Sequence, residues 1–86
     1  MRTRCTIGEM AAELERMGFT PSRRGSGADA FLFVEAAGRA VELSEDEGQW
    51  VMEFWAGDGE SAFPVKERSV GSDHDALQAV AEWLLR

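Results

Sequence analysis

The side chains best suited to chemistry in this chain are one histidine, one cysteine and sixteen carboxylates. His74 lies between Asp73 and Asp75, and such a triplet could supply metal ligands or an acid–base group. Consecutive residues on a helix do not face one another, so the three side chains would diverge within one helical turn. Ser72 and Asp75 also form an S-x-x-D pattern, which is typical of a helix start. We therefore expect these residues to cap a helix and not to bind a metal.

The remaining candidates for catalysis are weak. Cys5 is the only cysteine, so an internal disulfide is impossible, and a Cys–His pair would require Cys5 to meet His74 in space. The acidic stretch Glu45–Glu47 lacks the ligand spacing of a calcium loop, and no spacing among the acids selects a pair for proton transfer. We expect no enzymatic activity, no cofactor and no metal.

Two helices frame the chain. Thr6 and Glu9 form a T-x-x-E capping box, and an apolar residue recurs every three or four positions as far as Met17. Gly18 then provides a left-handed stop, which predicts a helix over Ile7–Met17. The second helix follows Ser72 and carries its own apolar stripe up to Leu84.

Between the helices, alternating apolar and polar residues predict three or four strands with short glycine-containing links. Pro64 marks the last of them as an edge strand. We predict a single α+β domain over 1–86, a two-layer sandwich in which both helices cover one face of an antiparallel meander. The predicted strands are Ala30–Ala36, Arg39–Ser44, Gln49–Ala56 and Phe63–Val70.

The segment Thr20–Asp29 contains Pro21 and two glycines, and we expect a flexible, solvated loop. It holds the only adjacent basic pair, Arg23 and Arg24. A basic loop flanked by glycine could hold a phosphate or an acidic peptide, but the spacing of a P-loop is missing.

The stretch Gln49–Ala56 is apolar on both faces of the strand that it predicts. The face without carboxylates should lie under the helices and contains Leu32, Val34, Val41, Leu43, Trp50, Met52 and Phe54, with Phe63 and Val65 expected to join it. The other face contains Phe31, Phe33, Glu35, Glu42, Val51, Glu53 and Trp55, with Lys66 and Arg68 at its edge. Exposed aromatic rings among charges are typical of an interface. A partner, a second copy of the chain or a covering loop could each bury them.

Charge points to the kind of partner. The net charge of −7 is uneven, because five arginines oppose three glutamates up to Arg24, whereas four basic residues oppose thirteen acids from Gly25 onward. Nucleic acids are bound through Lys and Arg, so we expect no direct nucleic-acid binding but attraction to a basic protein surface.

The opening residues MRTRCTIGEM hold no continuous apolar run, and no window is long enough to span a membrane. We expect a cytoplasmic protein without membrane contact.

The predicted order resembles that of the double-stranded-RNA-binding domain, α-β-β-β-α. That family has a lysine-rich start to its second helix, where this chain has Ser72–Asp75, so the resemblance implies a layout and not RNA binding. The acidic composition resembles that of small bacterial or phage inhibitors such as immunity proteins and anti-CRISPR proteins, and eight arginines against one lysine fit a GC-rich bacterial or phage gene.

We predict a non-catalytic module that masks a basic surface of a nucleic-acid-handling protein. The binding residues would be Phe31, Phe33, Glu35, Glu42, Glu53 and Trp55. The alternatives are a homodimer or assembly subunit that buries the same face, and a small-ligand binder with a cavity between sheet and helices.

Overall fold

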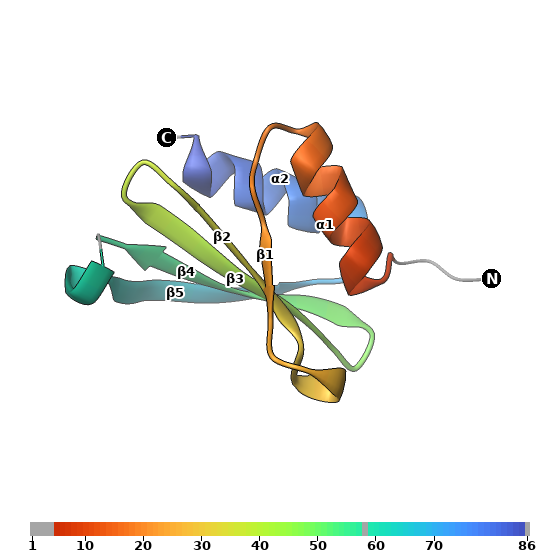
Figure 1. Ribbon diagram of the computed structural model, residues 1–86. Coiled ribbons are helices and arrows are strands. Elements are labelled where there is room, and N and C mark those ends of the chain that lie inside the picture. The colour runs from red at the N-terminus through yellow and green to blue at the C-terminus, as the bar shows by residue number, and fades with distance from the viewer. Residues whose placement is uncertain (1–4, 58, 86) are drawn as a thin grey trace.

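The computed structural model describes residues 5–57 and 59–85. Five antiparallel strands form one sheet in the order β1-β2-β3-β4-β5, and both helices lie on the same side of it (Figure 1). The predicted α+β sandwich is confirmed, with one more strand than expected. The elements are α1 (Ile7–Arg16), β1 (Ser22–Arg24), η1 (Gly27–Asp29), β2 (Phe31–Ala36), β3 (Arg39–Asp46), β4 (Gln49–Ala56), η2 (Gly59–Ser61), β5 (Phe63–Val70) and α2 (Asp73–Leu84).

Local signals set the ends of α1. Thr6 and Glu9 form both hydrogen bonds of the capping box. At the other end Gly18 has a φ of 97°, and the amide of Phe19 donates to the carbonyl of Leu14 at 3.0 Å, which is the Schellman arrangement. The predicted helix is therefore confirmed, with Met17 as its C-cap residue.

The two central hairpins have two-residue turns. Ala37 and Gly38 join β2 to β3, and Glu47 and Gly48 join β3 to β4, all four with positive φ. Turns of this kind match the right-handed twist of the strands and fix their register. This is why β3 extends to Asp46, two residues beyond the predicted end, and leaves only two residues in the acidic turn.

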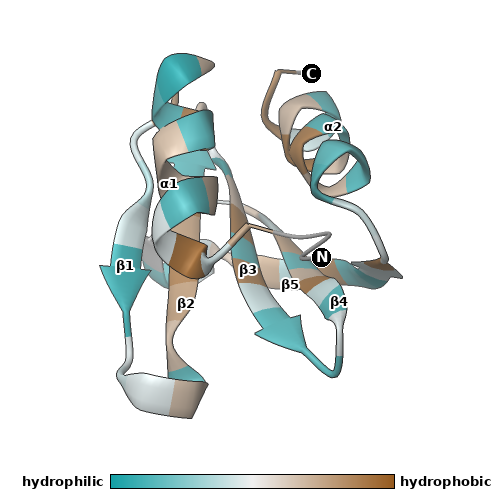
Figure 2. Cartoon of the chain, turned by 90° about the vertical axis from the view of Figure 1, so that its right-hand side faces the viewer, coloured by the Kyte–Doolittle hydropathy of each residue, from teal (hydrophilic) through white to brown (hydrophobic). Residues whose placement is uncertain are grey.

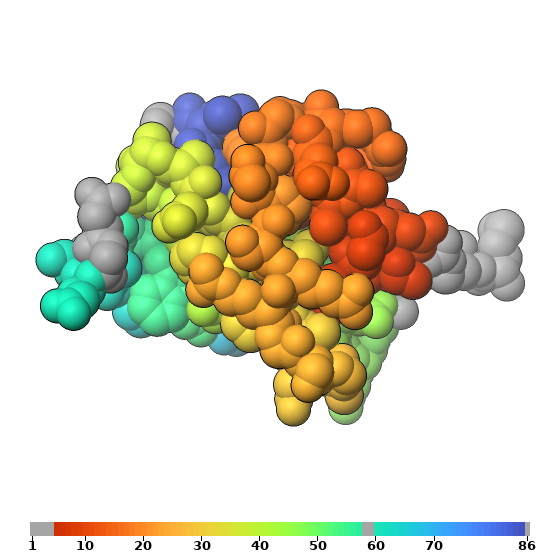
Figure 3. Space-filling view, in the orientation of Figure 1, coloured from red at the N-terminus to blue at the C-terminus, as the bar shows by residue number. Residues whose placement is uncertain are grey.

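The expectation of a flexible loop over Thr20–Asp29 is wrong in its centre. Ser22–Arg24 forms the edge strand β1, paired with β2 so that Arg24 lies opposite Phe31 and Ser22 opposite Phe33. In Figure 2 this strand is hydrophilic whereas β2 is mostly hydrophobic, and in Figure 3 the segment lies on the outside of the molecule. Because all three β1 residues are exposed, no apolar alternation marks the strand, and only the free backbone edge of β2 explains it.

The β5 strand corrects a second expectation. An irregularity between Phe54 and Trp55 places Lys66 opposite Phe54 but Pro64 opposite Trp55, so that Val65 is the extra residue of a β-bulge. Phe63 and Val65 are 56% and 46% exposed and do not join the core. Because Lys66 and Arg68 lie opposite Phe54 and Met52, these two cations belong to the helix side and not to the other face.

The core fills the space between the sheet and the two helices. The carboxylate-free set that the alternation predicts on β2, β3 and β4 is buried there together with residues of both helices. Phe54 and Trp83 meet edge to face, with ring centroids 5.5 Å apart. Each fully buried large side chain stabilises the fold by about 1.5 to 3 kcal/mol. The fully buried side chains include Met10, Leu14, Leu32, Val34, Val41, Leu43, Trp50, Met52 and Val80.

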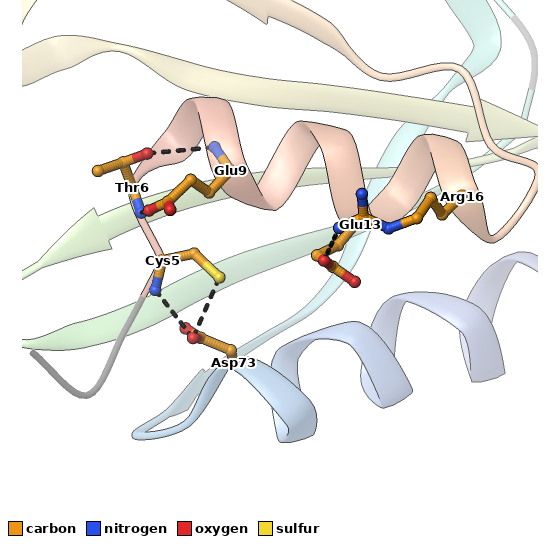
Figure 4. A network of polar contacts seen from close by, with 6 residues as sticks. All are labelled: Cys5, Thr6, Glu9, Glu13, Arg16 and Asp73. Atoms are coloured by element: carbon orange, nitrogen blue, oxygen red, sulfur yellow. Dashed lines mark hydrogen bonds and ion pairs between the residues drawn. The ribbon is translucent and has the colours of Figure 1, made fainter.

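Asp73, the first residue of α2, links three distant segments. One carboxylate oxygen accepts from the backbone amide and thiol of Cys5, at 2.8 and 3.1 Å, and the other accepts from the indole of Trp50 at 2.8 Å. Figure 4 shows Cys5 and Asp73 between the starts of α1 and α2, with the Arg16–Glu13 ion pair further along α1. Asp73 therefore joins both helix starts to β4, a role that its position at a helix start does not reveal.

No helix among the described residues is both long and apolar enough to cross a membrane.

Candidate protein-binding surface

We call the side of the sheet opposite the two helices the open face. The structure places all six predicted binding residues on it. Phe31, Phe33 and Trp55 are half-buried, as are Glu42 and Glu53, while Glu35 is exposed. The aromatic rings are therefore neither fully covered by the chain itself nor fully free in solvent, and the open face has no helical cover (Figure 1).

One row of side chains crosses the whole sheet on the open face. Directly opposed partners place Ser22, Phe33, Glu42, Glu53 and Glu67 in line from β1 to β5. Adjacent strands lie about 4.8 Å apart, so the three carboxylates span about 10 Å. We call Glu42, Glu53 and Glu67 the glutamate row. Directly opposed like charges destabilise a sheet, so this row is costly to the isolated fold.

Glu67 was not among the predicted binding residues. Its strand has an irregular register at Val65, so alternation counted from the start of the strand assigns its residues to the wrong faces. Counting backward from Val70, which lies opposite the buried Trp50, would have assigned Glu67 to the open face.

Glu42 is the member of the glutamate row whose charged form is disfavoured in the folded protein. Burial among its neighbours, and second the negative charge of Glu53, raise the pKa of Glu42 above the ordinary value of 4.5, while the positive charge of Arg24 opposes the rise. Within the described part of the chain, no lysine or arginine forms an ion pair with a member of the glutamate row. The surface thus carries negative charge that the fold itself leaves largely uncompensated.

Replacing Glu42 by glutamine is expected to stabilise the domain by about 0.5 to 1 kcal/mol at neutral pH, because one pair of opposed charges disappears. A raised folded-state pKa means that the native protein binds more protons than the unfolded chain between pH 4.5 and that raised value. Wild-type stability therefore falls as the pH rises through this window, and the advantage of Glu42→Gln should vanish below about pH 4.5. Urea unfolding between pH 3.5 and 7.5 measures this.

Glu15→Gln, on the exposed surface of α1, is the matched control because it also removes one negative charge from the protein. An identical pH profile of stability for wild type and Glu42→Gln would contradict the assignment of strain to the glutamate row.

The open face has an acidic groove between η1 and the sheet. Its volume is about 380 Å³, and η1 projects on the side away from the helices (Figure 1). The glutamate row forms its floor, and further carboxylates come from the ends of neighbouring elements. The lining includes Asp29, Phe31, Glu42, Glu45, Asp46, Val51, Glu53 and Glu67. A groove of this composition attracts a cationic group.

A second hollow on the open face, the aromatic pocket, has a volume of about 230 Å³. Its centre is Ala40 of β3, which lies directly between Glu35 of β2 and Trp55 of β4. The small Ala40 side chain leaves the space, and larger neighbours surround it. The pocket is lined by Phe33, Glu35, Ala40, Glu42 and Trp55, together with Gly57 and Ala62 beyond the end of β4.

The three tryptophans differ in how their indole N–H groups are satisfied. Trp50 donates to Asp73, and Trp83 donates to the carbonyl of Trp55 at 3.0 Å. The Nε1 atom of Trp55 is buried and has no hydrogen-bond partner among the described residues. Unsatisfied buried donors are rare in folded proteins, so Trp55 differs from the other two tryptophans in having a buried N–H without an acceptor among the described residues.

Arg24 partly compensates the open face. Its guanidinium carbon lies 4.1 Å from the ring centroid of Phe33, and its charge lowers the pKa of Glu42. The expectation of a flexible, solvated loop is therefore wrong for Arg24, which lies in β1 and stacks its side chain on Phe33. Arg24 does not line the aromatic pocket, so the stacking leaves the pocket open.

Of the residues considered for metal binding and catalysis, the structure brings Cys5 and Asp73 into contact. His74 is exposed, and Ser72 accepts from the amide of Asp75 as the capping pattern predicts. Among residues 5–57 and 59–85, no group of three histidine, cysteine or acidic side chains is placed to hold a metal ion.

Two hollows bear on the small-ligand hypothesis. One of only about 20 Å³ lies beside Phe54, Lys66 and Trp83, well below the roughly 300 Å³ of typical ligand pockets. The other has a volume of about 350 Å³ and is lined by Ile7 of α1, by η1 and by the end of β3 with its turn, Glu45–Gly48. Only the second is in the size range of a ligand pocket.

Comparison of this chain with protein-family models, with curated proteins and with solved structures gives no match. The functional argument therefore depends on the open face itself.

Proposed function

We propose that this chain is a non-catalytic protein-binding module that docks its open face on a basic surface of another protein. The observation that carries the proposal is the glutamate row, which places Glu42 directly opposite Glu53 and Glu53 directly opposite Glu67. Such a row costs stability in the isolated domain, and cationic side chains of a partner would offset that cost. Strain of this kind at a surface is typical of a site retained for function.

The aromatic residues beside the row support the same role. Phe33 and Trp55 are half-buried, rigid and adjacent to the carboxylates. Interfaces are held mainly by a few such rings near their centre, with charges around them that select the partner.

A specific form of the proposal is an inhibitor of a nucleic-acid-handling protein, of the bacterial or phage immunity or anti-CRISPR type. Proteins that bind nucleic acid present lysine- and arginine-lined surfaces, because they must neutralise phosphates. An open face with a carboxylate at each of three neighbouring strands matches such a surface in charge. The single cysteine is consistent with a reducing cytoplasm as the place of action.

The charge pattern favours a basic partner over a second copy of the chain. A symmetric dimer through the open face would bring two negatively charged surfaces together, and juxtaposed like charges cost about several kcal/mol at an interface. We therefore expect a monomer in sedimentation at micromolar concentration. If the wild type is instead a dimer, and if the Glu53→Gln variant dimerises more tightly, the homodimer alternative would be supported.

The proposal is tested by comparing what different forms of the protein capture from a bacterial host lysate. Wild type is expected to retain a basic protein that 0.5 M salt releases, since exposed charge pairs are screened at about that ionic strength. The double variant Glu53→Gln/Glu67→Gln should lose it. The matched double variant Glu15→Gln/Glu82→Gln, with the same net charge but changes on the helices, should retain it.

Equal retention by both double variants would show that net charge and not the open face selects the captured protein. Retention of an acidic protein by wild type would likewise contradict the proposal.

A further inference from the structure

We propose that the aromatic pocket receives an arginine side chain of the partner. This inference rests on the docking function proposed above and names the group that the partner inserts. A volume of about 230 Å³ is below the range of about 300 to 1,000 Å³ that is usual for drug-sized ligands. The pocket is therefore suited to a single long side chain.

The pocket walls match a guanidinium in both shape and charge. Phe33 and Trp55 contribute aromatic rings to the lining, and the acidic residues Glu35 and Glu42 line it from two neighbouring strands. Guanidinium is planar, stacks on aromatic rings and donates several hydrogen bonds in a rigid fork that suits carboxylates. Lysine presents a compact, strongly hydrated charge that uses flat walls less well.

The chain itself contains an example of this contact. The guanidinium of Arg24 already stacks over Phe33, at 4.1 Å from the ring centroid, although Arg24 does not line the pocket. One guanidinium is therefore already stacked on Phe33, and the pocket beside it offers Trp55 and two carboxylates to a second one.

A methylated lysine is the nearest competing occupant, because aromatic pockets also bind quaternary ammonium groups. A quaternary ammonium has no N–H, so it would leave Glu35 and Glu42 without a hydrogen-bond donor. The two carboxylates thus favour arginine.

The test uses four peptides, acetyl-Gly-Gly-X-Gly-Gly-amide, in which X is arginine, lysine, trimethyl-lysine or citrulline. Citrulline is the matched control, since it keeps the shape of arginine without the charge. Binding to the full chain is followed by NMR, with the indole N–H signal of Trp55 as the reporter. We expect the arginine peptide to bind about tenfold more tightly than the lysine peptide and the citrulline peptide to show no measurable binding.

Variants locate the binding. Ala40→Leu should fill the pocket and remove the preference for arginine, and Glu35→Gln, at an exposed position, should weaken arginine binding about fivefold without affecting the fold. Glu67→Gln, which lies outside the pocket, should leave the preference for arginine unchanged.

Three results would overturn the inference. The first is tighter binding of the trimethyl-lysine peptide than of the arginine peptide. The second is equal affinity for the arginine and lysine peptides, with no change in the Glu35→Gln variant. The third is no binding of any of the four peptides. None of these refutes docking by the glutamate row, which the capture experiment decides separately.

Discussion

Replacing both Phe33 and Trp55 by alanine is expected to weaken binding to the natural partner by at least about 100-fold while the domain stays folded. Central aromatic residues of an interface cost about 2 kcal/mol or more each when truncated, and 1.4 kcal/mol corresponds to a factor of ten. Both rings are half-buried on the open face, outside the helix-covered core. We therefore expect a loss of stability smaller than the 3 to 5 kcal/mol of a fully buried aromatic residue. Calorimetric titration with the purified partner measures the affinity, and circular dichroism checks the fold.

Met17 and Leu85 provide the matched control for this experiment. They are 44% and 73% exposed and follow α1 and α2, so they are large apolar residues that lie outside the open face. Met17→Ala/Leu85→Ala should bind like wild type. Unchanged affinity of the Phe33→Ala/Trp55→Ala variant would refute the assignment of the open face as the binding surface.

Replacing Asp73 by alanine is expected to lower the free energy of unfolding by about 2 to 4 kcal/mol. The indole N–H of the fully buried Trp50 and the backbone N–H of Cys5 both lose their acceptor. A buried donor left unsatisfied costs about 1 to 3 kcal/mol, and the helix start loses a favourable negative charge worth about 0.3 to 1 kcal/mol. Thermal unfolding should show a midpoint roughly 10 to 30 °C lower, given about 4 to 8 °C per kcal/mol for a domain of this size.

Asp75→Ala separates the two contributions. Asp75 lies in the same helical turn and is exposed, so its removal costs the charge without the contacts to Trp50 and Cys5. We expect a loss of about 0.5 kcal/mol for this variant. If Asp73→Ala were no more destabilising than Asp75→Ala, the contacts of Asp73 with Cys5 and Trp50 would not be important for stability.

The sequence by itself determined the elements whose signals are local. The capping pair Thr6 and Glu9 and the stop at Gly18 define α1 because both act within one or two helical turns. Alternation assigned β2, β3 and β4 to two faces correctly, because two-residue turns keep their register in step. The open face and its six predicted residues follow directly from that alternation.

Only the tertiary structure decided the rest. The strand Ser22–Arg24 exists because β2 offers a free edge, and its exposed residues carry no pattern of their own. The bulge at Val65 reversed the faces expected for β5 and so added Glu67 to the glutamate row while moving Lys66 away from it. The contact of Cys5 with Asp73 joins residues 68 positions apart. Such contacts depend on which distant segments the packing brings together. Residue propensity and hydrophobic periodicity describe only neighbours along the chain, so they do not predict these contacts.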